Sequence, residues 1–381
     1  MTRPLLLHDD ELLLYGFGGT HPLSVGRTRF AIELARHFGV VDQFQVRPSS
    51  EVDVELVRSA HDDDYIRAVR SNRSHPAYGI GTTDNPLVIG MHHIAARTVA
   101  ATVDACRSVW QGEVSRAVNI AGGWHHAMPA EASGFCIYND VVAGIKELQR
   151  LGCARIAYID VDAHHGDGVE LAFQDDPSVL TVSIHESPLT LFPGTGHGTD
   201  VGVGDGIGAT VNLPVPEGTD NQGWLRAFEA VVPAVVRQFR PDIIISQHGA
   251  DGHREDPLTG LALGVESMRR AYAMIADLAD ELCQGKWVVT GGGGYSPGNA
   301  VPRAWAHLLA TVAGERIDYD LATPQAWREL VGEGAPLRMG DGGSEDFACF
   351  EDGYDPANEI DRAIMTTRRA VFPELGLDPE Y

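Results

Sequence analysis

The sequence has few basic residues, no closely spaced cysteine pair and no long apolar run, and each of these features argues against a class of protein. Its 29 Lys and Arg residues face 53 Asp and Glu, a formal charge of −24, so it lacks the basic surplus that neutralises nucleic-acid phosphates. Its five cysteines include no CxxC pair, which disfavours both disulfides and a cysteine-built zinc site and favours a reducing cytoplasm. No apolar run reaches the roughly 20 residues that span a bilayer, and the early acidic residues Asp9, Asp10 and Glu11 disfavour a signal peptide.

What is present is the composition of a sizeable globular protein. The 381 residues are 44% hydrophobic, and no change in composition marks a second domain. We therefore expect one domain over residues 1–381, with a core at about 15–320 and a C-terminal loop and helix extension over 321–381. That extension contains an expected helix at Pro356–Val371.

Short β-branched runs alternate with helical periodicity through the centre of the chain, which predicts an α/β fold with a parallel sheet. The expected strands are Ala117–Ile120, Arg155–Ile159, Val179–Ile184, Asp242–Ser246 and Trp287–Thr290. The expected helices between and around them are Leu87–Trp110, Asp140–Leu151, Asn221–Phe239 and Val265–Leu282.

Each expected strand is followed by residues that can do chemistry. The segments AGGWHHA, DVDAHHGDG, HE, QHGADGHREDP and GGGGYSP come directly after the five strands in order. Because open parallel sheets bind ligands beyond the carboxyl ends of their strands, these five segments are expected to meet at one active site.

Asp162 and His164 are separated by one residue at the end of a strand, so they share a face and can bind one metal ion. Asp251, after another strand, is the natural third ligand. One imidazole and two carboxylates leave a position for water and substrate, and they suit Zn²⁺ but also Fe²⁺, Mn²⁺ or Co²⁺. The alternative is a solvated acidic loop, which the neighbouring HHGDG and the second acidic strand end disfavour.

The pair His125-His126 and Tyr295 supply the remaining groups for hydrolysis. A neutral histidine beside a metal site is the usual general base, and Asp160 and Asp167 are carboxylates available to orient the two imidazoles. Tyr295 follows four glycines and can donate to a developing oxyanion. Together these groups predict metal-assisted amide hydrolysis, in which histidine takes a proton from water and returns it to the leaving amine.

The motifs GGWHHAMPAEASGFCIYNDVV, YIDVDAHHGDGVELAF, TVSIHE, FPGTGH, QHGADGHREDPL and GGGGYSP run in order from Gly122 to Pro297. In this combination the sequence resembles the class I-like histone deacetylases of the arginase/deacetylase fold. GTTDNP, LPVPEGT and HREDPLTGLALG are most similar to the bacterial acetoin-utilisation (AcuC-like) branch. The resemblance implies a mostly parallel sheet of about eight strands with helices on both faces.

The resemblance also implies a role for individual residues. Asp162, His164 and Asp251 would bind Zn²⁺. His126, oriented by Asp167, would be the general base and acid. His125, oriented by Asp160, would be its electrostatic partner. Tyr295 would be the oxyanion donor. The implied substrate-binding residues are Asp84 at the rim, Phe135 and Phe192 as walls of an acyl-lysine tunnel, Gly134 between wall and metal, and Gly293. A structural K⁺ site would use Asp160, Asp162, His164, Ser183 and Ile184.

The function that the resemblance implies is removal of acetyl or other short acyl groups from protein lysines. An acetylpolyamine or other small-molecule amidohydrolase of the same fold is the alternative, since the acidic surplus suits either cationic substrate. A catalytically silent acetyl-lysine sensor is disfavoured by the complete set of catalytic groups. An arginase-like two-manganese site is disfavoured because Gly166 and the Asp251-Gly252-His253 run break its pattern. Nucleic acid and membranes are not expected partners, and oligomerisation is left open.

Overall fold

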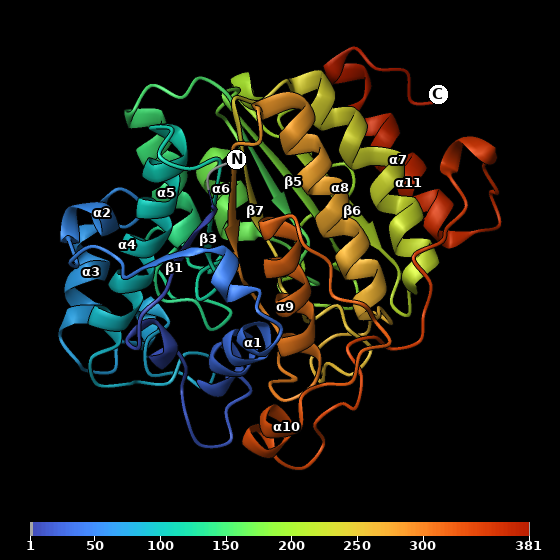
Figure 1. Cartoon of the computed structure of the whole chain (residues 1–381). Coiled ribbons are helices and arrows are strands. Elements are labelled where there is room, and N and C mark those ends of the chain that lie inside the picture. Colours follow the sequence, from blue (N-terminus) through green and yellow to red (C-terminus); the bar gives the residue numbers. More distant parts are fainter. Residues whose placement is uncertain (1–2, 381) are drawn as a thin grey trace.

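A computed structural model describes residues 3–380 as one sheet flanked by helices (Figure 1). Within those residues the sheet has eight strands, all parallel, in the order β2-β1-β3-β8-β7-β4-β5-β6. The α/β class, the parallel sheet and the number of strands are as predicted. The strands are β1 Leu5–Leu7, β2 Gln45–Arg47, β3 Arg116–Asn119, β4 Ile156–Asp160, β5 Val179–Glu186, β6 Thr210–Val215, β7 Ile243–Gln247 and β8 Trp287–Thr290.

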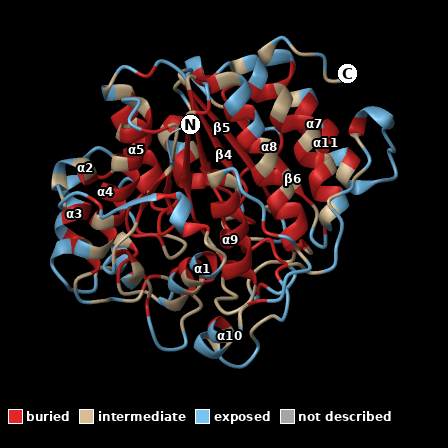
Figure 2. Cartoon of the chain, in the orientation of Figure 1, coloured by how far each residue is buried: buried red, intermediate tan, exposed pale blue. Residues whose placement is uncertain are grey.

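Helices cover both faces of the sheet, as expected, because the central strands are apolar on both sides. In β4, for example, Ile159 packs in the cluster formed with α1, α7, α8 and α9, while Ile156 and Tyr158 pack in the cluster formed with α4, α5 and α6. The helices are α1 Gly26–His37, α2 Val54–Arg58, α3 Asp63–Arg70, α4 Met91–Trp110, α5 Asp140–Arg150, α6 Asp167–Phe173, α7 Asn221–Phe239, α8 Val265–Cys283, α9 Ala300–Ala313, α10 Gln325–Val331 and α11 Glu359–Val371. Figure 2 shows the strands and the inner helix faces as the buried part of the molecule.

Three strands were not predicted, for local reasons. β1 and β2 are three residues long, and β2 lies exposed at one edge of the sheet. β6 contains Pro214, which argues against a strand in the middle of a sheet. It is tolerated because β6 is the opposite edge, paired with β5 alone.

The C-terminal extension packs onto the sheet's helical layer. Helix α11, expected from residue 356, begins at Glu359, where the side chain of Asn358 caps it by accepting from Ile360 N. Thr367 Oγ1 donates to the carbonyl of Asn212 in β6 at 2.7 Å. Asp361 is buried and accepts from the Arg226 guanidinium of α7 at 2.7 and 2.9 Å.

The parallel register brings the strand ends into one row. Asp160 at the end of β4 pairs with Ser183 of β5 on one side and with Gln247 of β7 on the other, and Gln247 pairs with Thr290 of β8. The segments after these strands therefore leave the sheet at the same edge, as predicted.

Candidate functional site

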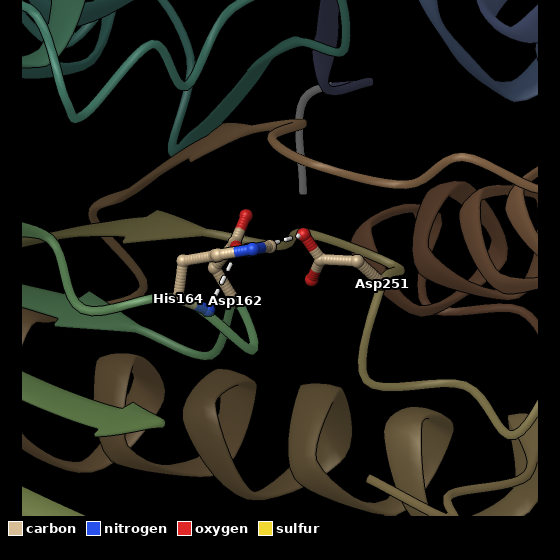
Figure 3. A group of neighbouring side chains, drawn as sticks. All are labelled: Asp162, His164 and Asp251. Atoms are coloured by element: carbon tan, nitrogen blue, oxygen red, sulfur yellow. Dashed lines mark hydrogen bonds and ion pairs between the residues drawn. The ribbon is translucent and has the colours of Figure 1, made fainter. Parts of the chain in front are cut away.

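The three candidate metal ligands lie together at this edge. Asp162 and His164 follow β4, Asp251 follows β7, and all three are buried. One potential ligand atom from each lies within 4.8 Å of the others (Figure 3). His164 Nδ1 is 3.1 Å from Asp162 Oδ1 and 3.0 Å from Asp251 Oδ2. One imidazole nitrogen and two carboxylates at this spacing fit a divalent cation such as Zn²⁺, and equally Fe²⁺ or Mn²⁺.

The ligand carboxylates are held by surrounding donors. Asp162 Oδ2 accepts from Gln247 Nε2 at 2.7 Å and from Gly293 N at 2.8 Å. Asp251 Oδ1 accepts from Ala163 N at 2.9 Å. Gln247 opens the segment QHGADGHREDP that was expected at the site, but no role was predicted for it, because nothing local in the sequence shows that its side chain turns toward the ligands.

Electrostatics at the triad favour a bound cation. Burial and the charge of Asp162 raise the pKa of the Asp251 carboxyl to about 6. Burial alone lowers the pKa of His164, but its hydrogen bonds to both carboxylates outweigh burial and raise that pKa well above its usual value. Two buried carboxylates this close repel each other, and positive charge between them relieves the repulsion.

Two histidine–aspartate pairs lie next to the triad. His125 Nδ1 is 2.7 Å from Asp160 Oδ2, and His126 Nδ1 is 2.7 Å from Asp167 Oδ1. A hydrogen bond from each Nδ1 to a carboxylate leaves Nε2 as the functional nitrogen, and the two Nε2 atoms are 3.0 Å apart. The structure thus brings together the pairs that the sequence suggested.

The two imidazoles have opposite pKa shifts. Burial and the positive charge of His125 lower the pKa of His126. For His125 burial also acts to lower the pKa, but the charges of Asp160 and Asp162 prevail and raise it to about 9. A neutral and a protonated imidazole side by side are suited to different roles in proton transfer.

Residues at the start of α5 hold the loop that carries the two histidines. Buried Asp140 accepts from Gly123 N and Trp124 N, and also from Thr102 Oγ1. Asn139, which caps α5 through its side-chain oxygen, uses its Nδ2 to hold the carbonyl of His125 at 3.2 Å. Sequence reasoning missed both residues, since a polar pair before an apolar helix indicates an ordinary N-cap.

Tyr295 is held by a carboxylate that the sequence did not single out. Its backbone N–H donates to Asp256 Oδ2 at 2.7 Å, and its ring centroid lies 6.4 Å from that of His164. Burial raises the pKa of the Tyr295 hydroxyl well above its usual value, so the phenol stays protonated and able to donate. Buried Arg27, between the rings of Trp124 and Trp305, donates to the carbonyl of Gly294 at 3.2 Å.

The candidate substrate-binding residues surround these groups. Phe192 is 48% exposed as a residue, and its ring packs edge-on to His126 with 5.1 Å between centroids. Phe135 packs in the same way on Tyr295 at 5.5 Å. Gly134 has a φ of +52°, and a Cβ there would lie 2.3 Å from the His126 ring, so both its conformation and its surroundings require glycine. Asp84 Oδ2 accepts from Gly134 N at 2.9 Å, which ties this carboxylate to the Phe135 loop.

The residues of the candidate potassium site also come together. Ser183 and Ile184 lie on β5, and Ser183 pairs with Asp160, from which the chain continues to Asp162 and His164. Ser183 Oγ is 2.9 Å from His185 Nδ1. The side chain of His253 is engaged away from the triad: Nε2 is 2.9 Å from Asp341 Oδ2, and Nδ1 accepts from Glu255 N at 3.1 Å.

Comparison with known proteins places this site in a family. A histone deacetylase domain matches residues 21–312. The chain belongs to the histone deacetylase family, and it is a deacetylase, a hydrolase of amide C–N bonds. Members of that family generally depend on a metal ion, and the triad described above is a possible site for one.

Within the family, the chain is similar to acetoin utilization proteins. It is 38% identical over 337 residues to AcuC of Bacillus subtilis (strain 168), which covers 86% of each chain. It is 37% identical over 318 residues to AcuC of Staphylococcus xylosus, covering 81% of this chain and 82% of that protein. AcuC of Staphylococcus aureus (strain MSSA476) is 35% identical over 351 residues, covering 89% and 90%. Within residues 3–380, none of the helices combines the length and apolarity needed to cross a membrane.

Proposed function

We propose that the protein removes acetyl or other short acyl groups from lysine side chains of proteins, with Zn²⁺ held by Asp162, His164 and Asp251. The observation that carries the proposal is the convergence of a buried metal-type triad, two histidine–aspartate pairs and a protonated tyrosine at one sheet edge. Fe²⁺ or Mn²⁺ suits the same ligands.

When bound there, Zn²⁺ would polarise the substrate carbonyl and make a water molecule more acidic. His126 Nε2 takes the proton of the attacking water, since the lowered pKa keeps this imidazole neutral while Asp167 fixes its tautomer. The same imidazole then delivers the proton to the nitrogen of the leaving lysine amine. His125, ionised beside Asp160, stabilises the negative charge that develops nearby.

Tyr295 donates its hydroxyl hydrogen to the oxyanion formed from the acyl carbonyl. Phe135 and Phe192 enclose the aliphatic stem of the lysine, and Gly134 and Gly293 lie beside it, next to His126 and Asp251. Asp84, at the rim, binds the backbone of the substrate. A K⁺ ion would stabilise the loop that carries the metal ligands. Its candidate ligands, largely main-chain oxygens, come from Asp160, Asp162, His164, Ser183 and Ile184.

We also propose that residues 1–381 form one catalytic domain, with the extension over 321–381 as an integral part of it. The contacts of Asp361 with Arg226 and of Thr367 with β6 support this. The five cysteines are free thiols, which supports a reducing cytoplasm as the place of action.

The test is to compare acetyl-lysine peptides with N-acetylputrescine and N-acetylspermidine on one zinc-loaded preparation, with the His126→Ala variant purified in parallel as the control for contaminating enzymes. We expect kcat/KM to be at least tenfold higher for the peptides. Higher kcat/KM for the polyamines would instead make the protein a small-molecule amidohydrolase. Hydrolysis of none of these substrates by the zinc-loaded protein would refute the proposed function.

A further inference from the structure

Asp341 lies in the C-terminal segment, beyond residues 21–312 that match the histone deacetylase domain, yet its side chain reaches the turn that carries a candidate metal ligand. We infer that Asp341 is a positioning residue that holds the turn over residues 251–256, and through it Asp251 and Tyr295, in the geometry needed for catalysis. This inference rests on the roles of Asp251 and Tyr295 in the proposed function.

Both carboxylate oxygens of Asp341 have defined partners. Oδ1 accepts from Arg303 Nη1 of α9 at 2.6 Å. Oδ2 accepts from His253 Nε2 at 2.9 Å and from Val265 N, at the start of α8, also at 2.9 Å. The backbone N–H of Asp341 donates to the buried carboxylate of Glu266 at 2.7 Å. The aspartate is thus fixed by two helices and can in turn fix His253.

His253 transmits this constraint to the turn. Its side chain is 1% exposed, and both ring nitrogens are used: Nε2–H donates to Asp341, while Nδ1 accepts from Glu255 N at 3.1 Å. The backbone around it is closed by a bond from Asp256 N to the carbonyl of His253 at 2.8 Å. A histidine whose two nitrogens are bonded in this way has one tautomer and one ring orientation.

The two ends of the turn reach the reacting groups. At one end, Asp251 belongs to the metal-type triad. At the other end, Asp256 Oδ2 accepts from Tyr295 N at 2.7 Å and so places the loop of the oxyanion donor. A shift of the turn would move a metal ligand and the tyrosine together, and partners outside the ligand shell are known to change metal affinity or activity by about 10- to 100-fold.

The matched pair of variants is D341N and D361N. Asp361 is also a buried carboxylate in the C-terminal segment, ion-paired with an arginine and accepting a backbone N–H, that of Asp355 at 2.8 Å, but it faces α7. Asparagine at 341 turns an N–H toward one of the donors, Arg303 or His253, in either orientation of its amide. Both variants should lose stability, so a purely structural role predicts similar effects of the two on the site.

The measurements are kcat and KM for an acetyl-lysine peptide and the visible absorption and affinity of bound Co²⁺, used as the probe metal. We expect D341N to lower kcat about tenfold, with KM changed less than twofold, to weaken Co²⁺ binding and to alter its spectrum. We expect D361N to keep the wild-type kcat per bound metal and the wild-type spectrum. H253A should reproduce the effects of D341N, and the double variant should be no worse than H253A alone.

Wild-type kcat and spectrum in D341N, or equal changes in D341N and D361N, would overturn the inference. If D341N does not fold, H253A provides the same test, because it leaves the Arg303–Asp341 ion pair in place. Should the wild-type protein hydrolyse no acetylated substrate, the proposed function fails, whereas the Co²⁺ spectra still decide whether Asp341 positions the ligands.

Discussion

Replacing Gly293 by alanine tests the metal site at a point where a side chain would meet both ligand carboxylates. A Cβ at position 293 would lie 2.0 Å from Asp251 Oδ2 and 2.9 Å from Asp162 Oδ2. Because Cβ atoms do not approach non-bonded heavy atoms within 3.0 Å, either the Asp251 oxygen or the backbone of residue 293, whose N–H donates to Asp162, must move by about 1 Å. That is several times the roughly 0.2 Å that a metal–ligand distance tolerates. We therefore expect Gly293→Ala to weaken zinc binding at least about 100-fold, a loss of about 3 kcal/mol.

The assay is competition for zinc against a chromogenic chelator, run alongside thermal unfolding of the same samples. Gly298→Ala is the control, since it adds a methyl group to the same loop but meets only the side-chain end of Val331, at 2.8 Å. It should bind zinc as the wild-type protein does. Zinc affinity of Gly293→Ala within threefold of wild type would refute the placement of the metal between Asp162 and Asp251.

Three other substitutions have defined outcomes. His126→Ala should lower turnover at least about 100-fold while zinc content stays near one per chain; loss of zinc would show that His126 is a ligand and not the base. Tyr295→Phe should lower kcat about 100-fold with little change in peptide binding, and unchanged kcat would remove the oxyanion assignment. Burial lowers the pKa of His61 to about 4 in the folded protein. As pH falls, the unfolded chain therefore binds a proton at His61 before the folded protein does, and the free energy of unfolding drops by about 2 kcal/mol between pH 7 and 5. In urea unfolding, His61→Gln should remove that part of the pH dependence. An unfolding free energy that depends on pH as in the wild-type protein would contradict this prediction.

The sequence predicted the strand ends well because their chemistry is local. Asp162 and His164 share a face through the two-residue period of an extended chain, and the parallel sheet then brings Asp251 to them. The five central strands were identified, with ends that differ by at most two residues, because they are apolar on both faces.

The residues that hold the ligands could not be predicted in this way. Gln247 directly follows the expected strand Asp242–Ser246 and carries no sign of its role, and Asp140 reads as the first turn of a helix. Only the folded structure turns them toward Asp162 and the His125 loop. Asp341 lies 88 residues from His253 in the sequence, so nothing local signals that the two side chains meet. Their roles depend on tertiary packing, on which hydrophobic periodicity carries no information.

The strand order has a consequence for how the protein is made. β3 lies between β1 and β8 in the sheet, but β4 to β7 are all synthesised before β8. At 5–20 residues per second, β3 therefore emerges from the ribosome roughly 10–30 s before the strand that covers its inner edge. During that interval the nascent chain presents an unpaired strand edge, a template for aggregation. Residues 1–119 hold 12 Arg against 14 Asp and Glu, so repulsion between nascent chains gives this edge little protection until the more acidic later part of the chain has been made.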